Sequence, residues 1–235
     1  MGQGTIEEPT YVREAFARIA DRYVTTNHVL SMGTDILWRR KVARMVRRWS
    51  PERVLDVATG TGDLALEIQD ACPDAEVIGS DFCPEMLEHA SERGLAKTLV
   101  ADTLDLPFED ASFDVVTVAF GLRNMANYEA ALKEMRRVLR PGGHALVLDF
   151  SLPEGPLRKP YRWYLHRVLP KLAGYLTRQP DAYEYLGGSI EEFPMGEEMA
   201  GLIGRCGFGD AEVIPVTFGV ATVYTGVAEG ESSNC

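Results

Sequence analysis

Apolar residues recur at helical spacing in the first fifty residues of the chain. Val12, Phe16, Ile19 and Tyr23 follow one another three or four positions apart, as on one face of a helix. The stretch 36–49 has the same period with basic residues between, and it ends before a Ser-Pro pair. The pattern predicts N-terminal helices.

Between residues 54 and 150 the pattern changes to short apolar runs that alternate with helical stretches. Such alternation implies right-handed βαβ units and a parallel sheet, and unbroken apolar runs suit strands covered on both faces. Pro141, Gly142 and Gly143 are expected to end the last helix. The predicted strands are 54–58, 76–81, 98–102, 113–120 and 144–150, and the predicted helices are 63–71, 84–94 and 128–139.

After residue 150 the alternation stops. An aromatic-rich helical stretch comes first, and two strands joined at Gly219 close the chain as a hairpin. We therefore expect an α/β fold, a Rossmann-like seven-stranded mostly parallel sheet with a C-terminal antiparallel hairpin. One domain over 1–235 is expected, with N-terminal helices at 1–50 and a helical insertion after strand five at 151–195. After residue 150, the predicted helices are 156–177 and 197–208, and the predicted strands are 211–219 and 220–228.

Charge and composition narrow the function. The chain has 24 Lys and Arg against 35 Asp and Glu, a formal charge of −11, which argues against a nucleic-acid partner. No apolar run approaches the roughly 18 to 20 residues of a membrane span, and the first residues lack the apolar core of a secretory signal. The cysteines have neither CxxC pairing nor zinc spacing, which favours reduced thiols in the cytoplasm and no metal. They are Cys72, Cys83, Cys206 and Cys235.

A glycine-rich turn links the first predicted strand of the sheet to its helix. Gly60-x-Gly62-x-x-Ala65 stands in that context, and Asp81 follows Gly62 by nineteen residues. This spacing meets the dinucleotide fingerprint, in which the glycines let a ligand approach the backbone. A tight turn without a ligand is the alternative.

Acidic residues at the strand ends discriminate between cofactors. Asp56, Asp63, Asp81 and Asp102 are expected at the carboxyl ends of the strands, where open α/β sheets bind ligands. An acid that opens a helix disfavours pyrophosphate, whereas S-adenosylmethionine (SAM) is net cationic and suits a carboxylate-rich crevice. In this interpretation Asp81 accepts hydrogen bonds from the ribose, and Asp102 with Thr103 binds the adenine amino group. Taken singly, each acid is equally well a helix cap or a solvated loop residue.

Several segments make the chain similar to a known family. VLDVATGTGD, SDFCPEML and the stretch from Asp102 to RVLRPGG resemble class I SAM-dependent methyltransferases. YVTTNHVLSMGTDILWRR, AFGLRN, RVLRPGGHALVLDFS and DAYEYLGGSIEEFP resemble the ubiquinone/menaquinone biosynthesis C-methyltransferases. This resemblance extends from about residue 12 to residue 227. The cofactor-binding set that we expect is completed by Thr59, Phe82 and Phe120.

The resemblance also implies a reaction and its residues. Arg123 and Asn124 would lie beside the methyl donor, with Arg123 stabilising a phenolate. The alternative for Arg123 is an ion pair that closes a loop. Because arginine stays protonated, a water oriented by Tyr23 and a carboxylate such as Asp149 are the expected partners in proton transfer. His28 is a further candidate, although a surface position is the simpler interpretation. Departures from the family pattern occur at Val24, Thr26, Asp35 and Asp149, where the family has Asp, Met, His and Glu.

We therefore expect SAM-dependent C-methylation of a demethylated isoprenoid quinol, with another lipophilic aromatic acceptor as the alternative. An NAD-dependent oxidoreductase and a non-catalytic scaffold stay open but are disfavoured by the acids and by the intact motifs. A homodimer and a peripheral membrane contact of this cytoplasmic protein also stay open. The candidate walls of a groove for the quinol tail, which are equally well core residues of a packed helix, are Trp163, Tyr164, Leu165, Val168 and Leu169. A basic surface, for which a solvated helix face is favoured over a membrane patch, is formed by Arg39, Arg40, Lys41, Arg44, Arg47 and Arg48.

Overall fold

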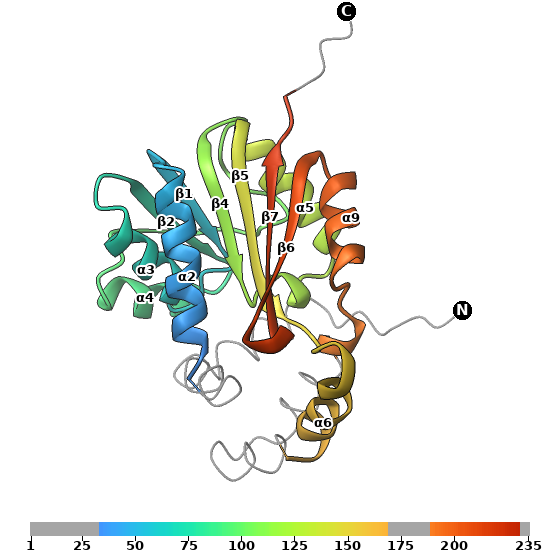
Figure 1. Cartoon of the computed structure of the whole chain (residues 1–235). Coiled ribbons are helices and arrows are strands. Elements are labelled where there is room, and N and C mark those ends of the chain that lie inside the picture. The colour runs from blue at the N-terminus through green and yellow to red at the C-terminus, as the bar shows by residue number, and fades with distance from the viewer. Residues whose placement is uncertain (1–32, 169–188, 231–235) are drawn as a thin grey trace, which may run out of the picture.

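A computed structural model describes residues 33–168 and 189–230 of the chain (Figure 1). The helix expected around Tyr23 lies outside these residues, as do His28 and the second half of the helical stretch 156–177. No helix in the described part is long and apolar enough to cross a membrane.

One seven-stranded sheet forms the centre of the molecule, in the order β3-β2-β1-β4-β5-β7-β6. The first five strands in sequence are parallel, while β7 is antiparallel to both β5 and β6. The Rossmann-like prediction with a C-terminal hairpin is therefore confirmed. The strands are β1 (Arg53–Val57), β2 (Glu76–Asp81), β3 (Lys97–Val100), β4 (Phe113–Ala119), β5 (Leu139–Phe150), β6 (Phe208–Val216) and β7 (Ala221–Ala228).

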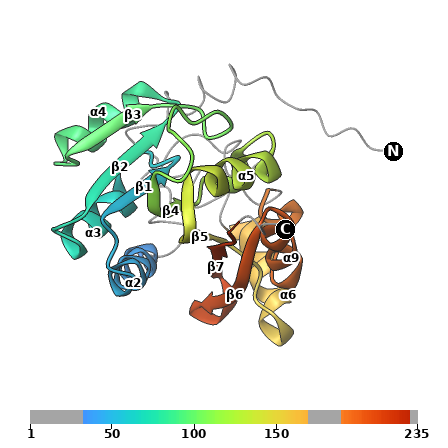
Figure 2. The ribbon, with the colours of Figure 1, turned by 90° about the horizontal axis from the view of Figure 1, so that it is seen from above.

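Helices cover both faces of this sheet (Figure 2). One apolar cluster joins α2 and α3 to side chains such as Val54 and Leu146, and the other joins α5 and α9 to side chains such as Leu55 and Val147. Alternate residues of one strand thus face opposite clusters, which explains the unbroken apolar runs. The helices are α2 (Asp35–Arg48), α3 (Asp63–Ala71), α4 (Pro84–Glu92), α5 (Tyr128–Val138), α6 (Arg158–Trp163) and α9 (Glu197–Arg205).

Shorter turns connect these elements. Three are 3-10 turns, and the fourth, η3, is a π-helical turn that continues α6. They are η1 (Leu122–Asn124), η2 (Gly155–Leu157), η3 (Tyr164–Val168) and η4 (Thr217–Gly219).

Predicted boundaries are wrong at two places. β6 begins and ends three residues before the predicted strand 211–219, because Thr217–Gly219 form a 3-10 turn. The predicted helix 197–208 accordingly ends at Arg205, before β6 begins at Phe208.

The other place is the start of β5. Pro141, Gly142 and Gly143 do not end the preceding helix, because α5 stops at Val138 and the three residues lie inside β5. The pairing of β4 with β5 shifts register at this point, between Phe113 and Val115. The proline and the two glycines therefore accommodate an irregularity in the strand rather than a helix end.

Candidate active site

The two glycines of the β1–α3 loop have different surroundings. Both have left-handed backbone, with φ of +57° at Gly60 and +79° at Gly62. A Cβ added to Gly62 would lie 3.0 Å from Cβ of Ala90, whereas one added to Gly60 would meet no atom within 4 Å. Gly62 therefore lets α3 pack closely against α4. Gly60 leaves open space above the backbone, as a close-fitting ligand requires.

Asp81 fastens this loop to the end of β2. One carboxylate oxygen accepts a hydrogen bond from the backbone N–H of Gly60 at 2.8 Å, and the other accepts from that of Cys83 at 3.0 Å. The side chain is buried, and burial raises the pKa of Asp81 although the two N–H groups oppose the shift. Each oxygen retains a lone pair, so the carboxylate is able to accept from a ligand hydroxyl as well.

Asp56 lies inside β1, beneath the loop. Thr59 and Thr117 each donate a hydroxyl hydrogen bond of 2.6 Å to a different oxygen of its carboxylate. Burial raises the pKa of Asp56 to about 6, although both hydroxyls lower it. Asp56 thus supports the loop through Thr59, and only 1 % of it is exposed.

Asp63, the first residue of α3, is held by arginines. Its carboxylate pairs with Arg93 at 2.7 Å and with Arg39 at 3.8 Å, and Thr61 donates a hydrogen bond to it. Of the four acids expected to line the crevice, this one is largely neutralised by its neighbours.

Arg39 lies beside the proposed site, although the sequence interpretation placed it on a basic surface. It is 4 % exposed, forms an ion pair with the buried Asp35, and its guanidinium lies 5.5 Å from the ring centre of Phe120. Helical periodicity could have predicted the burial of Arg39. Residues 35, 39, 42 and 46 share one face of α2, and all four are buried.

The remaining residues of the predicted cofactor set lie at the ends of β2 and β3. Asp102 is exposed, and one of its oxygens accepts a hydrogen bond from the backbone N–H of Leu104 at 2.9 Å. Thr103 beside it is buried, and Phe82 is half-buried after Asp81. Their contacts to a cofactor remain predictions.

Backbone strain marks the ends of the two central strands. Ala58, directly after β1, has φ of +48°, and Phe120, directly after β4, has φ of +60°. A Cβ added to Gly121 would lie 2.7 Å from Cβ of Ala58, so the two strand ends are in close contact. Left-handed backbone at residues other than glycine is costly, and such strain clusters at functional sites.

The ring of Phe120 points into the core. It is 1 % exposed, and its centre lies 6.2 Å from that of Trp38 and 4.6 Å from that of Phe150. Only the backbone of Phe120 therefore faces the strand ends. Its carbonyl accepts hydrogen bonds from the side chains of Arg123 at 3.0 Å and Asn124 at 3.2 Å.

Arg123 and Asp149 form a buried ion pair across β4 and β5. A guanidinium nitrogen of Arg123 donates to Oδ1 of Asp149, and the two side chains are 2 % and 0 % exposed. Burial raises the pKa of Asp149, against the opposing charge of Arg123. Nε of Arg123 and Oδ2 of Asp149 have no hydrogen-bond partner in the described part of the chain. Oγ of Ser80 is a third such atom among the described residues. Buried polar atoms without partners are rare, and a catalytic role is one of the explanations for them.

Tyr161 of α6 is a second residue that the sequence interpretation missed. The charge of Arg123 acts on its hydroxyl, and the ring packs against the cluster formed with α2 and α3. Burial raises the pKa of Tyr161. The sequence pattern could not single out Tyr161, because several tyrosines occur in the same aromatic-rich stretch.

The structure also places the expected groove walls. Leu165 is buried, Tyr164 and Val168 are half-buried, Trp163 is 64 % exposed, and Leu169 lies outside the described residues.

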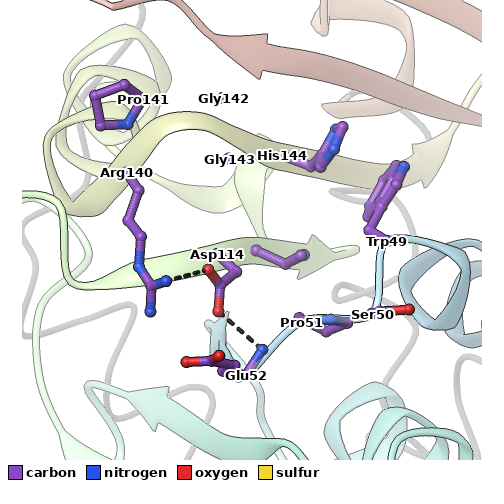
Figure 3. Close-up of a pocket in the computed structure, with 11 residues that line it drawn as sticks. Trp49, Ser50, Pro51, Glu52, Asp114, Arg140, Pro141, Gly142, Gly143 and His144 are labelled. Atoms are coloured by element: carbon purple, nitrogen blue, oxygen red, sulfur yellow. Dashed lines mark hydrogen bonds and ion pairs between the residues drawn. The ribbon is translucent and has the colours of Figure 1, made fainter.

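A pocket of about 350 Å³ lies at the opposite end of the sheet (Figure 3). Asp114 is its central acid, and its carboxylate accepts from the backbone N–H of Glu52 at 2.9 Å and pairs with Arg140 at 2.7 Å. Trp49 and His144 stack on one wall with ring centres 4.1 Å apart. Asp114 and Arg140 of this pocket are paired with each other, so its volume alone does not make it the reaction site.

Comparisons with known sequences give the family. Residues 5–228 match the model of the ubiE/COQ5 methyltransferase family. A demethylmenaquinone methyltransferase of Thermus thermophilus is 46% identical over 217 residues, which cover 90% of this chain and 98% of the relative. A ubiquinone/menaquinone biosynthesis C-methyltransferase of Geobacter sulfurreducens is 42% identical over 229 residues, covering 94% and 89%.

Comparisons with solved structures give the fold. A SAM-dependent methyltransferase of Thermotoga maritima, described as a possible histamine N-methyltransferase, has a TM-score of 0.66 at 20% identity and covers 93% of this chain and 100% of its own. A phosphoethanolamine N-methyltransferase of Haemonchus contortus, solved with S-adenosylhomocysteine, has a TM-score of 0.65 at 16% identity, covering 93% and 60%.

Proposed function

Because the chain belongs to the ubiE/COQ5 methyltransferase family, and is therefore a SAM-dependent methyltransferase, we propose that it methylates a ring carbon of a demethylated isoprenoid quinol. The relatives named above act on demethylmenaquinone or in ubiquinone and menaquinone biosynthesis. A demethylmenaquinol-like ring is thus the acceptor that we propose.

The observation that carries this proposal is the Arg123–Asp149 pair. It is enclosed at the carboxyl ends of β4 and β5, and it retains an unpartnered donor and an unpartnered acceptor within the described residues. Gly121, two residues before Arg123, packs against Ala58, which precedes the glycine loop. The pair and the loop therefore adjoin, as a reaction between a cofactor and an aromatic ring requires.

The residues of the loop fit SAM. The open space above Gly60 admits a ligand against the backbone, and Asp81 has lone pairs left for ribose hydroxyls. The carboxylates of Asp81 and Asp102 suit a net cationic ligand. When bound, SAM supplies an electrophilic methyl group on a sulfonium.

An aromatic carbon becomes nucleophilic when a neighbouring ring hydroxyl loses its proton. Arg123 would stabilise the resulting phenolate by a charge-assisted hydrogen bond in a site that excludes water. Because arginine stays protonated, the proton has to pass to another group. Asp149 is the nearby carboxylate, and its raised pKa makes it a better proton acceptor than an exposed aspartate. Asn124 would fix the turn that presents Arg123, through its bond to the Phe120 carbonyl.

The departure from the family pattern at residue 35 is compatible with the same acceptor. Asp35 is 0 % exposed and is engaged with Arg39 inside α2 and the core. The change from His to Asp therefore concerns internal support of Arg39. Val24 and Thr26 lie outside the described residues.

The test is methyl transfer from isotopically labelled SAM to short-chain demethylmenaquinol kept reduced. Product mass and the position of the methyl group are determined. A C-methylated ring supports the proposal, and Asp81→Asn is the control that should weaken SAM binding without altering the methylated position. SAM binding without turnover on any quinol would contradict the proposed acceptor and favour another lipophilic aromatic molecule.

A further inference from the structure

Five large apolar side chains are exposed at the end of the molecule that carries the proposed reaction site. We call them the docking face. They come from three separate segments: the start of α2, the region of η2 and α6, and η4. Their exposed fractions are 37% for Ile36, 60% for Leu37, 48% for Leu157, 64% for Trp163 and 83% for Phe218.

Specific contacts join the three segments. Nε1 of Trp38 in α2 donates a hydrogen bond of 2.7 Å to the hydroxyl of Thr217 in η4. The hydroxyl of Ser151, which precedes η2, donates to the carbonyl of Gly219 at the other end of η4 at 2.8 Å. Figure 1 accordingly shows the lower end of α2, the turn between β6 and β7, and α6 at the same end of the sheet. The docking face is thus one region of the fold rather than scattered residues.

The most exposed of these side chains is held out by strained backbone. Phe218 has φ of +58° and Thr217 has φ of +45°, conformations that are costly for residues other than glycine. The turn leaves the phenyl ring in solvent instead of folding it onto the core. Such strain persists where the surrounding structure fixes it, here through the bonds to Trp38 and Ser151.

The same region is locally basic, although the whole chain carries a charge of −11. Arg158, Lys159 and Arg167 are exposed and form no ion pair with any other described residue. Arg162 and His166 share Glu191. Exposed apolar side chains beside unpaired basic ones fit an interface that is apolar inside and anionic at its surface.

We propose that the docking face binds the surface of an anionic phospholipid bilayer and inserts the side chains of Trp163 and Phe218 between the headgroups. The inference rests on the proposed function, because a quinol with an isoprenoid tail resides in a bilayer. The basic residues of α2 do not form the single basic surface that the sequence predicts. Arg39 is buried, Arg40 pairs with Glu67, and Arg44, Arg47 and Arg48 follow along the helix toward the opposite end of the sheet.

The first experiment is flotation of the full chain with vesicles of phosphatidylglycerol and phosphatidylcholine in equal parts. We expect binding to these vesicles, and a blue shift of tryptophan emission on binding, because Trp163 is exposed while Trp38 is 3 % exposed. The variant Leu157→Ser/Trp163→Ser/Phe218→Ser should bind at least about tenfold more weakly, since it removes most of the inserted apolar area. Val100→Ser is the matched control, because Val100 is 53 % exposed at the end of β3, on the opposite edge of the sheet from β6 and β7.

The second experiment tests the charges. Arg158→Gln/Lys159→Gln should weaken binding to anionic vesicles by roughly fivefold per residue, and high salt should have a similar effect. Arg44→Gln/Arg48→Gln on α2 should leave binding unchanged. If Arg44→Gln/Arg48→Gln lost vesicle binding and Arg158→Gln/Lys159→Gln did not, the assignment of the docking face would be overturned.

Other outcomes separate this inference from the proposed reaction. A wild-type chain that does not float with anionic vesicles overturns the inference even if it methylates short-chain demethylmenaquinol. So does a dimer in sedimentation that the triple variant converts to a monomer, because a second copy would then cover the face. The variant Leu157→Ser/Phe218→Ser, which leaves the expected groove walls intact, should have unchanged activity on the short-chain quinol. Its activity on a long-tailed quinol presented in vesicles should fall about tenfold.

Discussion

The carboxyl and amino ends of the central sheet contain similar residue types in opposite states. At the amino end, Arg140 pairs with Asp114, which also accepts two backbone N–H groups, around an open pocket of about 350 Å³. At the carboxyl end, Arg123 and Asp149 are enclosed and each retains a polar atom without a described partner, beside strained backbone at Ala58 and Phe120. On the proposed function, the reaction belongs to the buried Arg123–Asp149 pair with its unpartnered polar atoms, and not to the Arg140–Asp114 pair beside the pocket.

The largest expected effect distinguishes the two arginines. Arg123→Lys should lower kcat by about 10²–10³-fold, because a lysine does not reproduce the planar donor set at a buried site. Arg140→Lys, which keeps the charge at an exposed pair, should change kcat by less than about twofold. Both are measured with short-chain demethylmenaquinol, with SAM affinity determined separately by calorimetry. Equal losses in the two variants would contradict the assignment of the reaction to the carboxyl end.

The next effect concerns the buried acid beneath the glycine loop. The pKa of Asp56 is about 6 in the folded chain and about 3.9 in an unfolded one. The folded state therefore keeps a proton that the unfolded state releases, and stability falls as pH rises between these two values. About two pKa units correspond to roughly 3 kcal/mol, fully expressed above the folded pKa.

Urea unfolding from pH 4 to 8 measures this dependence. Relative to Asp56→Asn, the wild-type chain should lose up to about 3 kcal/mol across the window. Thr117→Val removes a hydrogen bond that lowers the pKa of Asp56, so it should move the window to higher pH. A difference between wild type and Asp56→Asn that does not vary with pH would show that Asp56 is not protonated in the fold.

Alanine substitutions at the two glycines of the loop should have smaller and different effects. Gly62→Ala should destabilise the fold by about 2 kcal/mol, from left-handed backbone and from the 3.0 Å approach to Ala90. Gly60→Ala should cost only about 1 kcal/mol of stability, because the space above it is open. Its SAM affinity should nevertheless fall at least about tenfold, as the new methyl group occupies the ligand's place. Thermal unfolding measures stability, and calorimetry measures SAM affinity. A larger loss of SAM affinity in Gly62→Ala than in Gly60→Ala would contradict the contact between Gly60 and SAM.

The smallest effect returns to the amino end. His144→Ala removes the stack on Trp49, in which the ring planes are 3° apart, and should cost about 1 kcal/mol. Burial lowers the pKa of His144, so this contribution should decrease as pH falls and the unfolded histidine takes up a proton. SAM affinity and kcat should not change. A loss of either would give the pocket in Figure 3 a role in the reaction.

Elements of the sheet were predictable because their signals are local. The predicted helix 63–71 and strand 76–81 coincide with α3 and β2, since periodicity and the flanking turn residues define both within one short window. The same local view placed Pro141, Gly142 and Gly143 at a helix end. Their position inside β5 depends on pairing with β4, which no local pattern contains.

The sequence by itself determined the family, the strand–helix alternation and the identity of the groups that we propose carry the chemistry, from the glycine turn to Arg123. Only the tertiary structure decided which of these groups meet. Asp149 reaches Arg123 across 26 positions because β4 and β5 pair in parallel and end together. Asp63 is matched by Arg93 and Arg39, and Asp56 is enclosed by Thr59 and Thr117. Side-chain identity is fixed residue by residue along the chain, whereas burial and partner are set by strand order and register over long range.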